Sequence, residues 1–150
     1  MPANTAPVFV ATANRGNDGT GAFGARLTGA NTTPTLSATT GANLLFTAGA
    51  NGSRVETVTF THVSDNPATA PVACMGRLWI CTSAAGANPR LIAEVSLTGT
   101  TAASNVLPQQ QQSVTFSPPL YMPSGSYLWT AVSVAQTSGA YDVTVQGGDY

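Results

Sequence analysis

The sequence predicts an all-β protein, an antiparallel β-sandwich of the jelly-roll kind with an extended N-terminal arm. Three observations predict it. Helical periodicity is absent, and Thr, Gly, Pro and Val are dense along the 150 residues. Short runs of alternating apolar and polar residues recur instead, each closed by turn residues. Each run has one apolar face, which only a second sheet can bury.

The first 43 residues differ in character from the rest of the chain. Ala, Asn, Thr and Gly dominate them and large apolar side chains are few, so this segment cannot form a core of its own. We therefore expect an extended N-terminal arm, residues 1–43, and a β-sandwich domain, residues 44–150. Either the sandwich itself or a partner chain would order the arm. The apolar residues that would contact a second subunit are Val8, Phe9, Val10, Phe23 and Leu27.

The run Arg54–Ser64 is the clearest strand signal in the sequence. Asn51-Gly52 precedes it, and both of these residues tolerate the positive φ that tight turns require. We therefore predict a hairpin in which Leu44–Thr47 is the partner strand. Alternation along the run places Glu56, Val58, Phe60 and His62 on one face and Val55, Thr57, Thr59, Thr61 and Val63 on the other.

The remaining strands follow at intervals typical of an all-β domain. Gly76 predicts a bulge near the middle of the next run. Pro118-Pro119 prevents a later run from continuing as a central strand, because proline donates no ladder hydrogen bond. In the run Arg90–Leu97, the residues expected to face inward are Leu91, Ala93, Val95 and Leu97. These further runs are Val72–Thr82, Arg90–Leu97, Ser113–Phe116, Tyr127–Ala135 and Tyr141–Gln146. Together with Leu44–Thr47 and Arg54–Ser64 they make seven predicted strands after residue 43.

Charged side chains make up only 7% of the sequence, and all five cations are Arg. An average soluble domain has about 25%. Direct binding of nucleic acid requires clustered positive charge, so that function is excluded. Disorder is excluded because 43% of the residues are hydrophobic. With 22 Thr and 12 Ser, the polar surface must be built mainly from hydroxyl and amide groups.

The residues that catalysis requires are scarce. His62 is the one histidine, and on a strand Ser64 would lie about 7 Å from it, too far for a direct hydrogen bond. Glu56 and Glu94 are carboxylates that facing strands could bring together for glycoside chemistry. Each is explained more simply as an outward residue paired with an arginine. The candidate partners are Arg54, Arg77 and Arg90. We therefore expect no catalytic residue and no enzymatic activity.

Metal and cofactor sites are not predicted either. Zinc needs several converging Cys or His ligands, and Asn17–Thr20, with its single carboxylate, is more simply an Asx turn than a calcium loop. The glycines at 16–21 lack the lysine and the helix of a phosphate loop. Cys74 and Cys81 would lie about 23 Å apart on one strand, whereas a disulfide requires about 7 Å or less. We expect two buried thiols in a reducing compartment.

The sequence also predicts no membrane partner. Its apolar stretches fall far short of the roughly 20 residues that a membrane span needs. The N-terminus lacks the basic and apolar regions of a secretory signal. A surface with so few charges does not oppose close packing by self-repulsion, which favours a subunit that lies against neighbours.

Four segments of the chain carry a resemblance to a known class of proteins. They are LLFTAGANGSRVETVTFTHVS at 44–64, NPRLIAEVSL at 88–97, LYMPSGSYLWTAVS at 120–133 and GGDY at 147–150. Together they look like small virion structural proteins of tailed bacteriophages, above all capsid decoration or cement proteins. The likeness covers about residues 44–150, and head-fibre and tail-associated sandwiches are similar as well.

The resemblance implies a β-rich protein without an active site or cofactor. It would bind the major capsid protein on the outside of the shell as a homo-oligomer, with a trimer favoured, and it would be assembled in the host bacterial cytoplasm. Arm residues and exposed strand edges would make the contacts. The alternative is a head-fibre or tail-associated sandwich that binds a receptor or glycan; its candidate contacts are Trp79 and Tyr121. A secreted carbohydrate-binding module is disfavoured by the missing signal.

Overall fold

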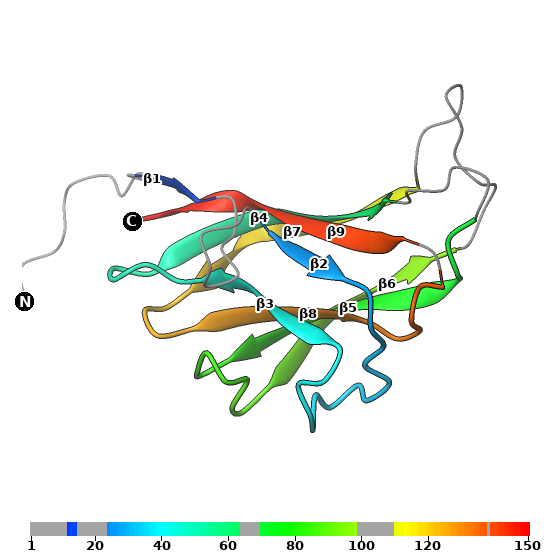
Figure 1. Ribbon diagram of the computed structural model, residues 1–150. Coiled ribbons are helices and arrows are strands. Elements are labelled where there is room, and N and C mark those ends of the chain that lie inside the picture. Colours follow the sequence, from blue (N-terminus) through cyan, green and yellow to red (C-terminus); the bar gives the residue numbers. More distant parts are fainter. Residues whose placement is uncertain (1–11, 15–23, 64–69, 99–109, 138) are drawn as a thin grey trace, which may run out of the picture.

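Two antiparallel β-sheets face each other in the protein and form an all-β, two-layered molecule (Figure 1). The computed structural model describes residues 12–14, 24–63, 70–98, 110–137 and 139–150. Within these ranges every regular element is a strand, and the same residues contain no helix long and apolar enough to cross a membrane. The prediction of an all-β fold is confirmed.

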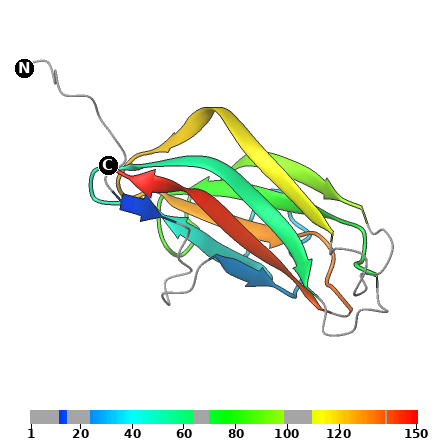
Figure 2. The ribbon, with the colours of Figure 1, turned by 90° about the horizontal axis from the view of Figure 1, so that it is seen from above.

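One layer is a five-stranded sheet with β9 and β4 at its centre. β9 pairs with β4 along most of its length, and β1 and β2 lie on the other edge of β9, near its two ends. β7 pairs only with β4, and Figure 2 shows β7, β4 and β9 running side by side. The strands of this sheet are β1 (Thr12–Asn14), β2 (Ala25–Leu27), β4 (Ser53–Val63), β7 (Gln111–Met122) and β9 (Ala140–Asp149).

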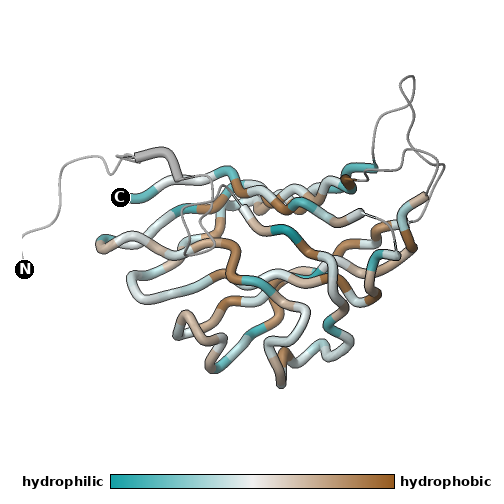
Figure 3. The backbone as a smooth tube through the Cα atoms, viewed as in Figure 1, coloured by the Kyte–Doolittle hydropathy of each residue, from teal (hydrophilic) through white to brown (hydrophobic). Residues whose placement is uncertain are grey.

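The other layer is a four-stranded sheet with the order β3-β8-β5-β6. Its strands are β3 (Ala42–Thr47), β8 (Tyr127–Val132), β5 (Cys74–Cys81) and β6 (Arg90–Leu97). The seven strands expected from the sequence are all present as β3 to β9, and β6 has the predicted bounds. The core lies between the layers, and Figure 3 shows apolar residues recurring along the strands of both.

The predicted hairpin between Leu44–Thr47 and Arg54–Ser64 is wrong. β3 pairs with β8, whereas β4 pairs with β7 and β9 in the opposite sheet. A turn does form, since Gly52 has φ of +87° and its N–H donates to the Gly49 carbonyl oxygen at 3.0 Å. Both strands are apolar on one face, and these faces are buried when they oppose each other across the sandwich rather than lie side by side.

Two β-bulges reverse the predicted alternation. In β4 the register shifts between Val55 and Thr57, so Val55 is fully buried with Val58 instead of facing outward with the threonines. In β6 the register shifts opposite Leu78 and Trp79, and Leu91 is 41% exposed instead of facing the core. An extra residue in one strand turns every side chain on one side of it to the other face.

Gly76 does not mark the bulge that the sequence predicts. Its pairing with β6 and β8 is regular. A Cβ atom on Gly76 would lie 3.0 Å from the Phe60 ring and 3.0 Å from a methyl group of Val95. The glycine is therefore explained by close packing between the two sheets.

β7 continues through Pro118 and Pro119, but only as an edge strand, as the sequence predicts. It pairs regularly with β4 on both sides of residues 116–119, which are the extra residues of the β4–β7 register shift. Proline is tolerated there because no further strand requires its missing N–H.

The predicted extended arm is not confirmed for residues 24–43. β2 pairs with β9, and Leu27 is 1% exposed within the core of its own chain. Leu27 is therefore not available as a subunit contact. The remaining candidate contacts, Val8, Phe9, Val10 and Phe23, lie outside the described residues. Of the two partners considered for the arm, the sandwich itself orders residues 24–43.

Candidate functional site

The outer face of the five-stranded sheet is a broad polar surface. Inward residues of β4 such as Val58 and Phe60 are fully buried, so the intervening threonines point away from the core. Their cross-strand neighbours on β7 and β9 are hydroxyl or amide residues, apart from Asp142 opposite Thr61. We call this surface the hydroxyl-amide face; it comprises Thr57, Thr59, Thr61, Gln111, Ser113, Thr115, Thr144 and Gln146.

Side chains on the hydroxyl-amide face bind one another across the strands. The hydroxyl groups of Thr59 and Ser113 are 2.9 Å apart and share a hydrogen bond. The Gln111 side-chain amide donates to the Thr61 hydroxyl at 3.1 Å. Both pairs are neighbours in the β4–β7 register. These two contacts orient the side chains of Thr59, Thr61, Gln111 and Ser113 on the face.

The charges beside this face neutralise each other. Arg26 on β2 binds Asp142 on β9 through two hydrogen bonds, at 2.7 and 3.0 Å. Arg54 lies 2.7 Å from Glu56 on the same strand. The paired charges leave little long-range electrostatic force at this surface, so contacts made through it would depend on hydrogen bonds and shape.

Two tyrosines lie together at one end of the hydroxyl-amide face. Tyr121 on β7 is 58% exposed, and its ring centroid lies 6.1 Å from that of Tyr150, with an angle of 35° between the rings. Arg54 is the cross-strand neighbour of Tyr121. The Asn51 amide donates to the Tyr150 carbonyl oxygen at 3.3 Å. We call this cluster the tyrosine patch, with members Asn51, Arg54, Tyr121 and Tyr150.

Trp79, the other aromatic candidate for glycan contact, is buried and that prediction is wrong. Its side chain is 0% exposed, and its indole N–H donates to the Pro34 carbonyl oxygen at 2.8 Å. The covering segment, residues 28–41, lies on the outer face of the four-stranded sheet. Its Leu36 packs with Trp79, Cys81 and Trp129 in a second apolar cluster. Sequence alternation could not indicate this burial, because the cover comes from a distant part of the chain.

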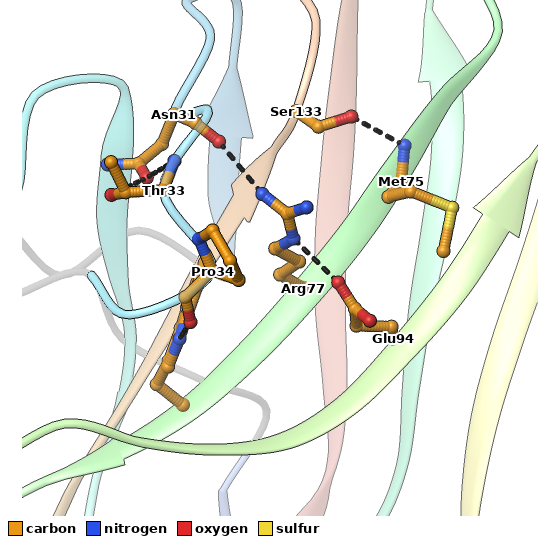
Figure 4. Close-up of polar contacts among 8 residues, drawn as sticks. Asn31, Thr33, Pro34, Met75, Arg77, Glu94 and Ser133 are labelled. Atoms are coloured by element: carbon orange, nitrogen blue, oxygen red, sulfur yellow. Dashed lines mark hydrogen bonds and ion pairs between the residues drawn. The ribbon is translucent and has the colours of Figure 1, made fainter.

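Asn31 holds the covering segment in place, and the sequence analysis did not identify it. It is 4% exposed, and its amide donates to the carbonyl oxygens of Ala38 and Thr40 at 2.7 and 2.9 Å. Figure 4 shows the backbone oxygen of Asn31 accepting from Arg77, which also binds Glu94 at 2.7 Å.

The residues considered for catalysis are distributed through the fold. His62 is fully buried and contacts Tyr141 edge to face, with ring centroids 5.3 Å apart. Glu56 and Glu94 lie in different sheets, and each binds an arginine, as the sequence analysis preferred. Ser64 and Asp18 lie outside the described residues. Within the described ranges, no group of three or more His, Cys, Asp or Glu side chains is placed to hold a metal ion.

Both cysteines are free and buried, as predicted. Cys74 belongs to the core between the sheets and Cys81 to the cluster under the covering segment. Burial raises the pKa of each thiol to about 11, although at Cys74 hydrogen bonds with Val134 and Gln136 act in the opposite direction. Burial, and then the neighbouring Cys74, raise the pKa of Tyr141 above its ordinary value. Such thiols are poor nucleophiles at neutral pH.

A groove of about 640 Å³ lies between the covering segment and the β5–β6 turn. It is lined by Pro34, Thr35, Asn88, Pro89, Arg90 and Leu91. Arg90 is its one ionisable side chain, so the groove brings no acid, base or nucleophile together. The hydroxyl-amide face with its tyrosine patch is therefore the stronger candidate site.

Of the sequence-predicted site residues that the structure describes, only Tyr121 lies in this site. Tyr150 and Arg54 join it through the pairing of β4 with β7 and β9. Their sequence signals, a terminal tyrosine and an arginine after a turn, do not by themselves indicate a shared surface. Neither a protein-family model nor a curated protein matches the chain.

Proposed function

We propose that the chain is a non-enzymatic virion structural protein that binds the outside of a phage capsid and stabilises the shell. The observation that carries the proposal is the hydroxyl-amide face, an exposed polar sheet surface whose adjoining charges are already paired. Its threonine and serine side chains lose little rotamer freedom when they bind. The resemblance of residues 44–150 to decoration proteins points to the same function.

We infer that the strand order is that of a jelly roll. From β2 onward, the sheets are β2-β9-β4-β7 and β3-β8-β5-β6. Eight strands divided between two such sheets are the pattern of two Greek keys, which is common in viral capsid and lectin domains. This argument is an analogy between folds and supports the function only as such.

The docking mechanism is the sum of many weak contacts. Threonine and glutamine side chains donate and accept hydrogen bonds, and replacing water by protein partners contributes about 1 kcal/mol for each bond. The proposed partner is the major capsid protein. A homo-oligomer, with a trimer favoured, would present several hydroxyl-amide faces at once, so that weak single contacts combine into stable attachment.

Co-sedimentation with capsids assembled without this chain tests the proposal. The wild-type protein is expected to pellet with the shells. Thr144→Arg places a long charged side chain in the middle of the hydroxyl-amide face and should abolish pelleting. Ser96→Arg is the matched control, because Ser96 is also an exposed strand residue but lies on the four-stranded sheet. A wild-type protein that stays in the supernatant, or equal effects of the two variants, would refute the proposal.

A second candidate function is a head-fibre or tail-associated sandwich that binds a receptor. The exposure of Tyr121 favours this function, whereas Trp79, the other predicted glycan contact, is buried. Shells that sediment without the protein, together with binding of the protein to host cells, would favour this function over the first.

A further inference from the structure

We propose that the tyrosine patch binds a neutral saccharide. Tyr121 and Tyr150 present aromatic surface at the edge of a polar sheet, with Arg54 and Asn51 beside them. A saccharide has the matching chemistry, since the C–H face of a sugar ring packs on an aromatic ring while its hydroxyl groups bind polar side chains. This inference goes beyond capsid binding and does not depend on it.

The Tyr121 ring and the Tyr150 backbone both lie against the turn before β4. A Cβ atom on Gly52 would lie 3.0 Å from the Tyr121 hydroxyl, so the edge of this ring contacts the turn. The backbone N–H of Tyr150 donates to the Gly52 carbonyl oxygen at 3.1 Å. Because one ring and one backbone segment of the patch are already positioned by the turn, binding a sugar requires less ordering of the protein.

Polar groups beside the rings are suited to sugar hydroxyls. Arg54 contacts Glu56 through one of its terminal nitrogens, and a guanidinium has five N–H donors. The side chain of Glu56 is 50% exposed and offers acceptors next to these donors. The other cross-strand neighbour of Arg54 is Gly148, which has no side chain to cover the guanidinium.

The charge of the patch selects a neutral ligand. The Arg54–Glu56 pair is electrically neutral, so a sialic acid, a sulfated sugar or a phosphate would meet the Glu56 carboxylate without an unpaired cation to offset it. The aromatic surface comprises two rings, which is small for a protein or lipid partner. A saccharide of one or two units matches both the size and the charge.

The experiment is a glycan array that carries neutral, sialylated and sulfated glycans, probed with the full-length purified chain. We expect signals from neutral glycans. Titration calorimetry with the strongest neutral glycan should then show an affinity loss of about tenfold for Tyr121→Ala, and a smaller loss for Tyr121→Phe, which keeps the ring. Leu91→Ala is the control, because Leu91 is also exposed but lies on the opposite sheet.

Thermal melting monitored by circular dichroism verifies that each variant is folded. No array signal, binding confined to acidic glycans, or an unchanged affinity of folded Tyr121→Ala would each overturn the inference. Capsid co-sedimentation is a separate measurement. Glycan binding without shell binding therefore supports the saccharide site and refutes the proposed function. Shell binding without glycan binding supports the proposed function and refutes the saccharide site.

Discussion

Asn31 shows how one buried amide determines the shape of a surface. Its side chain donates to two carbonyl oxygens of the covering segment and accepts from the N–H and hydroxyl of Thr33. All four bonds connect residues within ten positions of each other, so they close a compact loop. That loop provides the Pro34 carbonyl oxygen that binds the Trp79 indole.

Asn31→Ala should lower the free energy of unfolding by about 2 kcal/mol, because it removes four part-buried hydrogen bonds made by a buried side chain. Urea denaturation followed by tryptophan fluorescence measures the change. Asn43→Ala is the control: the Asn43 amide makes one exposed hydrogen bond, to the Arg26 carbonyl oxygen at 2.7 Å, and its loss should cost less than about 1 kcal/mol. Equal effects would contradict the role assigned to Asn31.

Cys74 and Cys81 should not react with a thiol reagent at pH 8 in the folded protein. Their side chains are buried, and their pKa of about 11 keeps them protonated. Ellman's reagent should report two thiols in urea and almost none in buffer. Rapid reaction in buffer would show that the covering segment or the core opens readily.

Stability should fall as the pH rises above 9. The thiol pKa is 9.0 in the unfolded chain and about 11 in the folded one, so the unfolded state releases these protons first. This contribution to stability is thus complete below pH 9 and declines between pH 9 and 11, by about 1 kcal/mol per pH unit for each thiol. Urea titrations at several pH values measure the slope. The Cys74→Ala/Cys81→Ala variant should have a shallower slope, and an unchanged slope would exclude the thiols as the cause.

At the scale of elements, close packing between the two sheets depends on a glycine. At Gly76 on β5, a Cβ atom would meet the Phe60 ring of β4 at 3.0 Å. The bulge at Glu56 keeps Val55 in the same core. The packing of the two sheets therefore depends on the bulge in β4 and on the glycine in β5.

Gly76→Ala should destabilise the protein by about 1 to 3 kcal/mol, because the added methyl group overpacks the space between the sheets. Gly29→Ala is the control, since its nearest contact would be an ordinary 3.5 Å. Chemical denaturation of both variants tests the difference. If Gly76→Ala left the free energy of unfolding unchanged, the Phe60 and Val95 side chains would have to move aside at little energetic cost.

At the scale of the whole molecule, the scarcity of charge takes a specific form. Arg26, Arg54 and Arg77 each bind a carboxylate at 2.7 Å. The charges beside the hydroxyl-amide face therefore neutralise each other locally. Contacts made through it depend on short-range hydrogen bonds.

Binding to capsids should consequently be almost independent of salt. Raising NaCl from about 50 to 500 mM should change the apparent affinity by less than about twofold, since the charges beside the hydroxyl-amide face are already paired. Co-sedimentation across this range measures it. A loss of tenfold or more would indicate that charges outside the described residues contribute.

The all-β class and the seven strands after residue 43 could be predicted from the sequence. Alternation between apolar and polar residues is local, so β6 could be located with its observed bounds, and the edge position of β7 followed from Pro118-Pro119. Tertiary structure alone decided which strands pair, where the bulges fall and which aromatics are exposed. Trp79 is buried by the covering segment, whose Pro34 carbonyl oxygen accepts its indole N–H from 45 residues away in the sequence. Tyr121 contacts Tyr150 only because β7 and β9 flank β4. Pairing across the chain depends on how apolar faces meet in space, and that information is absent from the alternation within any one strand.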